Sequence, residues 1–140
     1  MPEAVFLDSN IFMYAAGAPH LYKIPCVQIL LGVERGTLRA AINTEVFQEI
    51  LYRYNRLKLA DKGLALSREI LRYPLVILPI TEADIRLAVD VFDVHRSAGL
   101  KPRDAIHFAT MQNNGLTQLI SADKEFDVIP NIKRVDPLTY

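Results

Sequence analysis

Four carboxylates in this sequence follow or begin elements that would bring them together: Asp8, Glu49, Asp104 and Asp123. Asp8 directly follows the apolar run 4–7, and Asp123 comes shortly after the apolar segment 118–121. Short apolar runs of this kind predict strands that are buried on both faces of a parallel sheet. Because ligands bind at the carboxyl ends of such strands, we expect Asp8 and Asp123 at the same functional edge.

A third carboxylate is expected to reach this edge from a helix. Pro102 suits the first turn of a helix, and Asp104 falls within that turn. A short turn after this helix leads into the strand at Gln118, so the helix must run back along the sheet. Its start, with Asp104, is therefore expected at the carboxyl edge.

The fourth carboxylate comes from a helix that Thr44 is expected to cap and that continues to about residue 57. At about 100° per residue, Glu49 lies about 130° from the centre of the apolar stripe, and Glu45 lies about 170° from it. We expect Glu49 to lean over the sheet edge and Glu45 to face water. The stripe consists of Val46, Phe47, Ile50, Leu51 and Tyr54.

Four converging carboxylates need a compensating charge. Two unit charges about 4 Å apart repel by about 4 kcal/mol at an effective dielectric constant of about 20. Several such pairs would consume most of the roughly 5–15 kcal/mol by which a domain is stable. A divalent cation removes this cost, and hard oxygen ligands favour Mg²⁺, or else Mn²⁺, over zinc.

The elements that would position these side chains alternate between strand and helix. Strands are expected at 4–7, 38–42, 118–121 and 132–135, with another extended apolar segment at 75–80. Helices are expected at about 25–35, 44–57, 60–72, 81–98 and 102–114. This order is typical of an α/β fold with a short, mostly parallel sheet of four to five strands, covered by helices on both faces.

Length and composition set further bounds. A chain of 140 residues without a linker or repeat predicts a single domain over 1–140. The 16 basic and 16 acidic residues cancel, which argues against a coat protein held on nucleic acid by a broad positive field. One cysteine, Cys26, excludes a disulfide framework, and we expect it in the core. No apolar run approaches the length of a membrane span, and no leader is evident, so a cytoplasmic protein is expected.

Four stretches in order resemble the PIN-domain family, and within it the VapC-type toxins of prokaryotic type II toxin–antitoxin pairs. They are VFLDSNIFMY around Asp8, NTEVFQEIL around Glu49, KPRDAIHFATMQNNG around Asp104 and LISADKEFD around Asp123. Each stretch alone is weak, but the four together in one chain of this length are specific. The resemblance implies a three-layer α/β/α fold with a twisted sheet, and Mg²⁺-dependent cleavage of RNA phosphodiester bonds.

The resemblance also implies roles for individual residues. Asp8 and Asp104 would hold the metal, with Asp123 contributing, and either Glu49 or Asp123 would orient or deprotonate the attacking water. Both the use of one or two ions and the choice between Glu49 and Asp123 stay open. Contacts to RNA would come from Ser9, Asn10, Arg103 and Lys124, and Lys101, Arg53 and Arg56 could also hold phosphates.

Two kinds of protein partner follow from the same resemblance. A cognate antitoxin would occupy the acidic groove, and family members commonly form homodimers. The apolar residues within 29–31 and 64–71 could serve either the core or such a dimer face.

Simpler roles remain for each acid considered alone. Asp8 and Asp123 could form turns, Asp104 could favour the helix dipole, and Glu49 could pair with Arg53 on a helix surface. Asp127 is a further, weaker candidate. Of the three histidines only His107 is expected near the site, and we expect it to have a structural role there.

Other functions would use a related cluster of acids. A non-catalytic PIN-like binding module or a housekeeping PIN nuclease without a toxin role stays open. A phosphatase of the Asp-x-Asp type would need a carboxylate at position 10, where Asn10 stands, and a receiver domain would need two adjacent acids near the start. No P-loop or G-x-G-x-x-G motif is present, so no nucleotide cofactor is expected.

Overall fold

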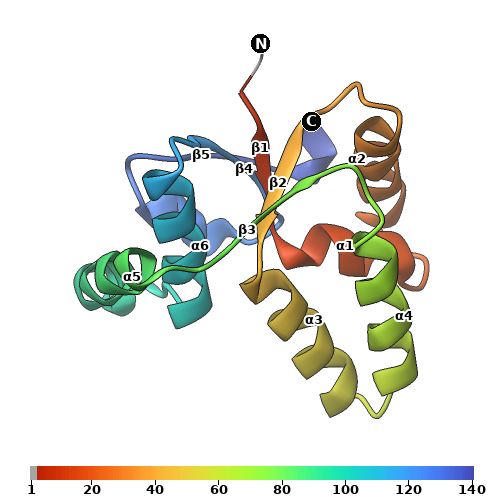
Figure 1. The fold of residues 1–140 in the computed structure, drawn as a ribbon, viewed down its shortest axis with the longest axis horizontal. Helices are drawn as coiled ribbons and strands as arrows, with labels where there is room; N and C mark the ends of the chain where they lie inside the picture. Colours follow the sequence, from red (N-terminus) through yellow and green to blue (C-terminus); the bar gives the residue numbers. More distant parts are fainter. Residues whose placement is uncertain (1–2) are drawn as a thin grey trace.

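Five short parallel strands form one sheet at the centre of the computed structural model, which describes residues 3–140 (Figure 1). Their spatial order is β3-β2-β1-β4-β5. The strands are β1 (Val5–Leu7), β2 (Ala40–Asn43), β3 (Val76–Leu78), β4 (Gln118–Ile120) and β5 (Lys133–Val135). The predicted alternation and parallel pairing are confirmed, and the extended segment at 75–80 contributes an edge strand.

Helices cover both faces of the sheet and complete a three-layer α/β/α fold. One face packs against α1 (Ser9–Ala16), α2 (Lys23–Glu34), α3 (Glu45–Arg56) and α4 (Ala60–Ile70), and the other against α5 (Glu82–His95) and α6 (Pro102–Asn113). In the described part of the chain, short 3₁₀ helices also cover Arg96–Ala98, Lys124–Val128 and Pro137–Thr139. Within residues 3–140, none of the helices has the length and apolar character needed to cross a membrane.

The central strands divide their side chains between two cores, as a doubly covered sheet requires. Val5 and Leu7 pack with α1 to α4, whereas Phe6 between them packs with α5 and α6. The predicted core position of Cys26 is confirmed, because this side chain is fully buried in the core beneath α1 to α4, and burial raises the pKa of its thiol to about 12.

The structure differs from the sequence-based expectation at two helix starts. Helix α1 was not predicted, because eight residues are too short to display a helical period. It begins directly after β1, and the Asp8 carboxylate caps it by accepting the Ser9 N–H at 2.8 Å. Thr44 does precede α3, but its side chain makes no capping hydrogen bond there. Thr81, in contrast, forms a capping box with Asp84.

Helices α3 and α4 form a hairpin that projects from the sheet (Figure 1). The two helices can pack closely because residue 63 of α4 is a glycine. A Cβ at this position would lie 2.8 Å from the Cβ of Tyr54. We expect Gly63→Ala to lower the free energy of unfolding by about 1–3 kcal/mol, because the helices must separate. Urea denaturation would measure this. A rise of about 1 kcal/mol, as the helix propensity of alanine alone predicts, would contradict it.

Candidate active site

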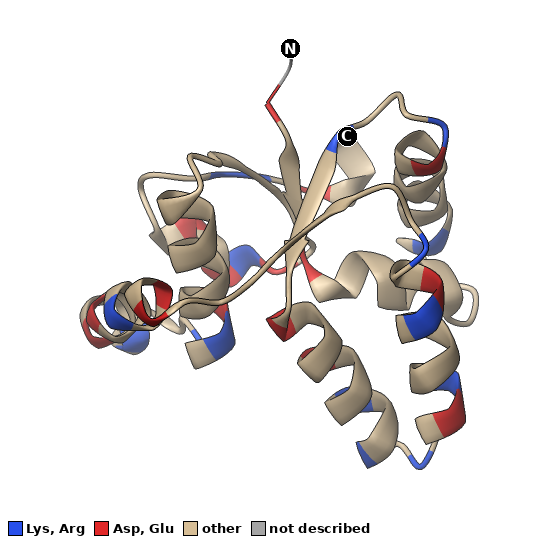
Figure 2. Ribbon diagram, in the orientation of Figure 1, with Lys and Arg blue, Asp and Glu red and all other residues tan. Residues whose placement is uncertain are grey.

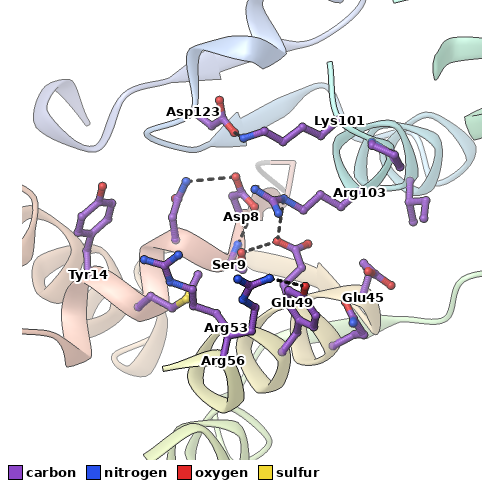
Figure 3. A pocket seen from close by; sticks show the side chains of 16 residues that line it. Asp8, Ser9, Tyr14, Glu45, Glu49, Arg53, Arg56, Lys101, Arg103 and Asp123 are labelled. Atoms are coloured by element: carbon purple, nitrogen blue, oxygen red, sulfur yellow. Dashed lines mark hydrogen bonds and ion pairs between the residues drawn. The ribbon is translucent and has the colours of Figure 1, made fainter. Parts of the chain in front are cut away.

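A groove of about 880 Å³ opens at the carboxyl edge of the sheet, between α1, α3 and the start of α6. In Figure 2 acidic segments mark the start of both α1 and α3 below the central strands. Asp8, Glu49 and Asp123 line this groove, as Figure 3 shows. Asp104 lies beside them with 1% of its surface exposed. The structure thus brings the four predicted carboxylates to one edge.

Asp8 is held by three donors where β1 ends. Its carboxylate accepts hydrogen bonds from Ser121 Oγ at 2.7 Å, the Ser9 N–H at 2.8 Å and Asn10 Nδ2 at 3.3 Å. Burial raises the pKa of Asp8, and the charge of Glu49 adds to this, although His107 and the hydrogen bonds act in the opposite direction. The carboxylate is therefore fixed in place before any ligand binds.

Glu49 projects from α3 into the same region and is 9% exposed. Burial alone would raise its pKa, but the hydrogen bonds from His107 and Ser9 and the charge of Arg103 lower the pKa overall. Ser9 Oγ donates to Glu49 Oε2 at 2.6 Å, and Arg103 Nε lies 3.8 Å from the same oxygen. His107 Nε2 contacts the other oxygen, Oε1. Glu49 is therefore ionised at neutral pH.

The pKa of Asp104, in contrast to that of Glu49, is raised. Asp104 lies in the first turn of α6, where its carboxylate accepts the Lys101 backbone N–H at 3.1 Å. Burial raises the pKa of Asp104 to about 7, and the nearby charges of Asp123 and Asp8 contribute to the rise. In the metal-free site Asp104 is thus about half protonated at neutral pH, and a cation would displace that proton.

The ligand atoms fall into two neighbouring groups. One contains Asp8, Glu49 and His107, and the other contains Asp104, Asp123 and Glu125; within each group the atoms lie within 4.8 Å of one another. Mostly carboxylate donors of this kind fit a hard divalent cation. Asp8 and Asp104, which were expected to share an ion, stand in different groups.

Basic side chains border the acids without neutralising them fully. Lys101 Nζ lies 3.2 Å from Glu125 and 4.0 Å from Asp123, and its side chain is 45% exposed. Arg103, Arg53 and Arg56 also line the groove (Figure 3). The rim is thus positive and the floor negative, an arrangement that the zero net charge of the chain conceals.

The predicted RNA contacts are placed unequally. Arg103 lines the groove as expected, but Lys124 is exposed and lies outside the set of lining residues, because it begins a 3₁₀ helix after Asp123. Lys101 takes the place expected for Lys124. Ser9 and Asn10 line the groove, yet the Ser9 hydroxyl donates to Glu49 and the Asn10 amide donates to Asp8 and Ser121. Both therefore organise the acids.

Two other acids differ from their expected settings. Glu45 does not face water fully; it is partly buried in the groove wall, and burial raises its pKa. Asp127 lies apart from the groove, where it pairs with Arg134 at 2.8 Å. That arginine also donates to the Ser121 carbonyl at 3.0 Å and so supports the end of β4.

Ser121 was not recognised from the sequence as a residue of the site, whereas His107 was expected near the site with a structural role. Ser121 directly follows β4 and connects Asp8, Asn10 and the backbone N–H of Asp123. His107 is fully buried between α6 and α3, against Glu49 and 3.7 Å from Asp8. The available signal for His107 was its place one helical turn after Asp104, on the side that faces the sheet edge.

Comparison with known proteins agrees with this geometry. The PIN domain family matches residues 5–132. Ribonuclease VapC13 of Mycobacterium tuberculosis is 35% identical over 131 residues, covering 94% of this chain and 98% of the relative. The crystal structure of VapC20 of Mycobacterium tuberculosis, described as a sarcin-ricin loop cleaving toxin, superposes with a TM-score of 0.77 at 14% identity, over 92% of this chain and 97% of that one. A toxin–antitoxin complex from Klebsiella pneumoniae contains a chain with a TM-score of 0.65 at 22% identity, over 96% and 98%.

Proposed function

Because the chain belongs to the PIN-domain family, we propose that it is a Mg²⁺-dependent endoribonuclease of the VapC type, the toxin of a toxin–antitoxin pair. The observation that carries the proposal is the convergence of four buried or half-buried carboxylates from distant segments at one sheet edge. Carboxylates in this number persist in a stable fold when a divalent cation offsets their repulsion. We propose that residues 1–140 form one such domain.

The position of each residue in the site suggests its role in the reaction. Asp8, Asp104 and Asp123 would hold the metal, and because their ligand atoms belong to two groups, the site would bind either one ion or two. A bound Mg²⁺ supplies Lewis acidity toward a phosphate oxygen and lowers the pKa of a bound water. Glu49, ionised because its neighbours lower its pKa, is suited to accept a hydrogen bond from the attacking water. Asp123 is the alternative for this role.

The positive rim would hold the RNA backbone on either side of the cleaved bond. Arg53 and Arg56 lie one and two turns beyond Glu49 on α3, and Lys101 and Arg103 approach from α6 (Figure 3). Because phosphates would meet acids on the floor, binding depends on these cations and on the metal. Ser9 and Asn10 act indirectly, through the carboxylates they orient.

Substitution of Arg53 and Arg56 by glutamine is expected to weaken RNA binding several-fold for each residue. The loss of one phosphate contact reduces the slope of log affinity against log salt concentration by about 0.7 for single-stranded nucleic acid. Fluorescence anisotropy with a labelled RNA at several salt concentrations measures both effects. Arg72→Gln, an exposed position outside the groove, is the matched control. If the variant with both Arg53→Gln and Arg56→Gln showed an unchanged salt dependence, these arginines would not contact the RNA phosphates.

An antitoxin and a second copy of the chain are the expected protein partners, in the cytoplasm where the RNA is. The antitoxin would cover the same groove and exclude RNA from it. Of the two apolar segments expected to form core or dimer face, Ile29 and Leu30 are buried in the core, whereas Leu64 and Leu71 are exposed by 39% and 60%. Of these two segments, the one at 64–71 therefore offers more exposed apolar surface to a homodimer face.

Cleavage of purified total RNA with Mg²⁺, with EDTA and with the Asp104→Asn variant tests the activity directly. The result expected is cleavage by the unaltered protein with Mg²⁺ only. Absence of cleavage together with RNA binding would support a non-catalytic binding module instead. Growth arrest on expression, relieved by co-expression of a small neighbouring gene, separates a toxin from a housekeeping nuclease.

A further inference from the structure

Among residues 3–140, His107 is the one buried titratable side chain at the site that the proposed mechanism does not use. It lies on α6, one turn beyond Asp104, and is 0% exposed. Its Nε2 contacts Glu49 Oε1 and lies 3.7 Å from Asp8 Oδ1. Unlike both acids, it does not line the groove. The imidazole is therefore placed behind the carboxylates, on the side away from the substrate.

The surroundings of the ring leave it little freedom. Its plane packs against Phe6 of β1 with ring centroids 5.3 Å apart at an angle of 51°. The contact with Glu49 joins residues that are 58 positions apart and connects α6 to α3. Because packing against the sheet holds the ring in place, a group that is hydrogen-bonded to the ring is held in a fixed position as well.

Glu49 depends on such contacts for its orientation. A glutamate on a helix has several rotatable bonds, and its carboxylate would otherwise sample the groove. His107 holds Oε1 and Ser9 holds Oε2 at 2.6 Å, so both oxygens are engaged from different helices. Removal of His107 or Ser9 would leave one of the two carboxylate oxygens without this hydrogen bond.

We propose that His107 is a positioning residue: its Nε2–H holds Glu49, beside Asp8, in the orientation that metal binding and water activation require. This rests on the proposed function, and it deepens it by assigning the group that preorganises the acids. The role needs only a hydrogen-bond donor at Nε2, which the charged imidazole and the Nε2–H tautomer of the neutral imidazole both supply. Partners of this kind, behind ligands and catalytic groups, typically change metal affinity or activity by about 10–100-fold.

Direct coordination by His107 is the competing arrangement, because its Nε2 lies within 4.8 Å of ligand atoms on Asp8 and Glu49. Two observations favour positioning. The Nε2 atom is already occupied by Glu49 Oε1, and the ring is not exposed in the groove from which an ion would enter. Coordination would require Glu49 to leave His107.

The test uses three variants of the full chain. His107→Gln keeps an amide N–H at about the reach of Nε2, His107→Asn carries the same amide one methylene shorter, and His107→Leu fills the space without a donor. Mn²⁺ affinity of the RNA-free protein is measured by electron paramagnetic resonance, and kcat and KM are measured on a defined RNA. Thermal unfolding reports whether each variant is folded.

We expect His107→Gln to stay within about threefold of the unaltered protein in Mn²⁺ affinity and kcat. His107→Leu and His107→Asn should lose about 10–100-fold in both, with KM for RNA changed by less than about threefold. If the leucine variant fails to fold, the comparison of Gln with Asn decides, since both are polar and differ only in reach.

Equal losses in Gln and Asn, or full activity in Leu, would overturn the proposal. A loss of Mn²⁺ affinity in all three variants that is much larger than the loss for Mg²⁺ would show that His107 is itself a ligand. Because the Mn²⁺ measurement needs no RNA, it is informative even if the unaltered protein cleaves no RNA, a result that would contradict the ribonuclease function instead.

Discussion

Asp8→Asn is expected to reduce RNA cleavage at saturating Mg²⁺ by about a thousandfold, which corresponds to about 4 kcal/mol of transition-state stabilisation. The amide removes one negative oxygen from the group that contains Glu49 and His107. It also disturbs the acceptor of the Ser121 and Asn10 hydrogen bonds. Single-turnover kinetics on a defined RNA, with excess protein, measure the loss without interference from product release.

The same substitution should leave the fold intact. Asp8 is a buried carboxylate whose pKa is raised by burial, so removal of its charge relieves a cost in the metal-free protein, and the free energy of unfolding should stay equal or rise. Asp127→Asn is the matched control, since Asp127 is exposed, pairs with Arg134 and lies outside the groove. Retention of more than about a tenth of the activity by a folded Asp8→Asn protein would contradict the assigned role.

The metal-free protein is expected to lose stability as the pH rises from about 4 to about 7. The pKa of Asp104 is about 7 in the folded chain against an ordinary value of 3.8. The folded state therefore binds a proton that the unfolded state releases in this range, and stability falls with rising pH by up to about 1.4 kcal/mol per unit. The raised pKa of Asp8 acts in the same direction.

A divalent cation should reverse this trend. It replaces the proton on Asp104, so metal affinity rises with pH through about 7 and binding releases protons into the buffer. Urea denaturation in EDTA and in Mg²⁺, across pH 4 to about 8, measures both trends.

The diagnostic quantity is the difference between the unaltered protein and Asp104→Asn, because other groups titrate in this range too. The lowered pKa of Glu49 also contributes to stability. This contribution is lost only at acidic pH, as the pH falls below the ordinary pKa of a glutamate. The Asn variant should show a flatter dependence in EDTA. An identical pH dependence of the two proteins would show that Asp104 is not protonated in the metal-free site.

Much of the fold was predictable because its determinants are local. Continuous apolar runs identified β1 and β4, and Thr81 and Pro102 marked the starts of α5 and α6 within a residue. The edge position of Asp8, Asp104 and Asp123 followed from the rule that parallel strands share their carboxyl ends. Helix α1 escaped prediction because two turns carry too little periodicity.

The sequence by itself therefore determined the order of the elements, the parallel sheet and the identity of the acids that meet at its edge. These depend on residue type and on spacing along the chain. Only the tertiary structure decided which side chains surround those acids. Lys101 rather than Lys124 borders them, and His107 and Ser121 hold them from 58 and 113 residues away. Contacts over such separations depend on how helices rotate against the sheet, and local periodicity does not record that rotation.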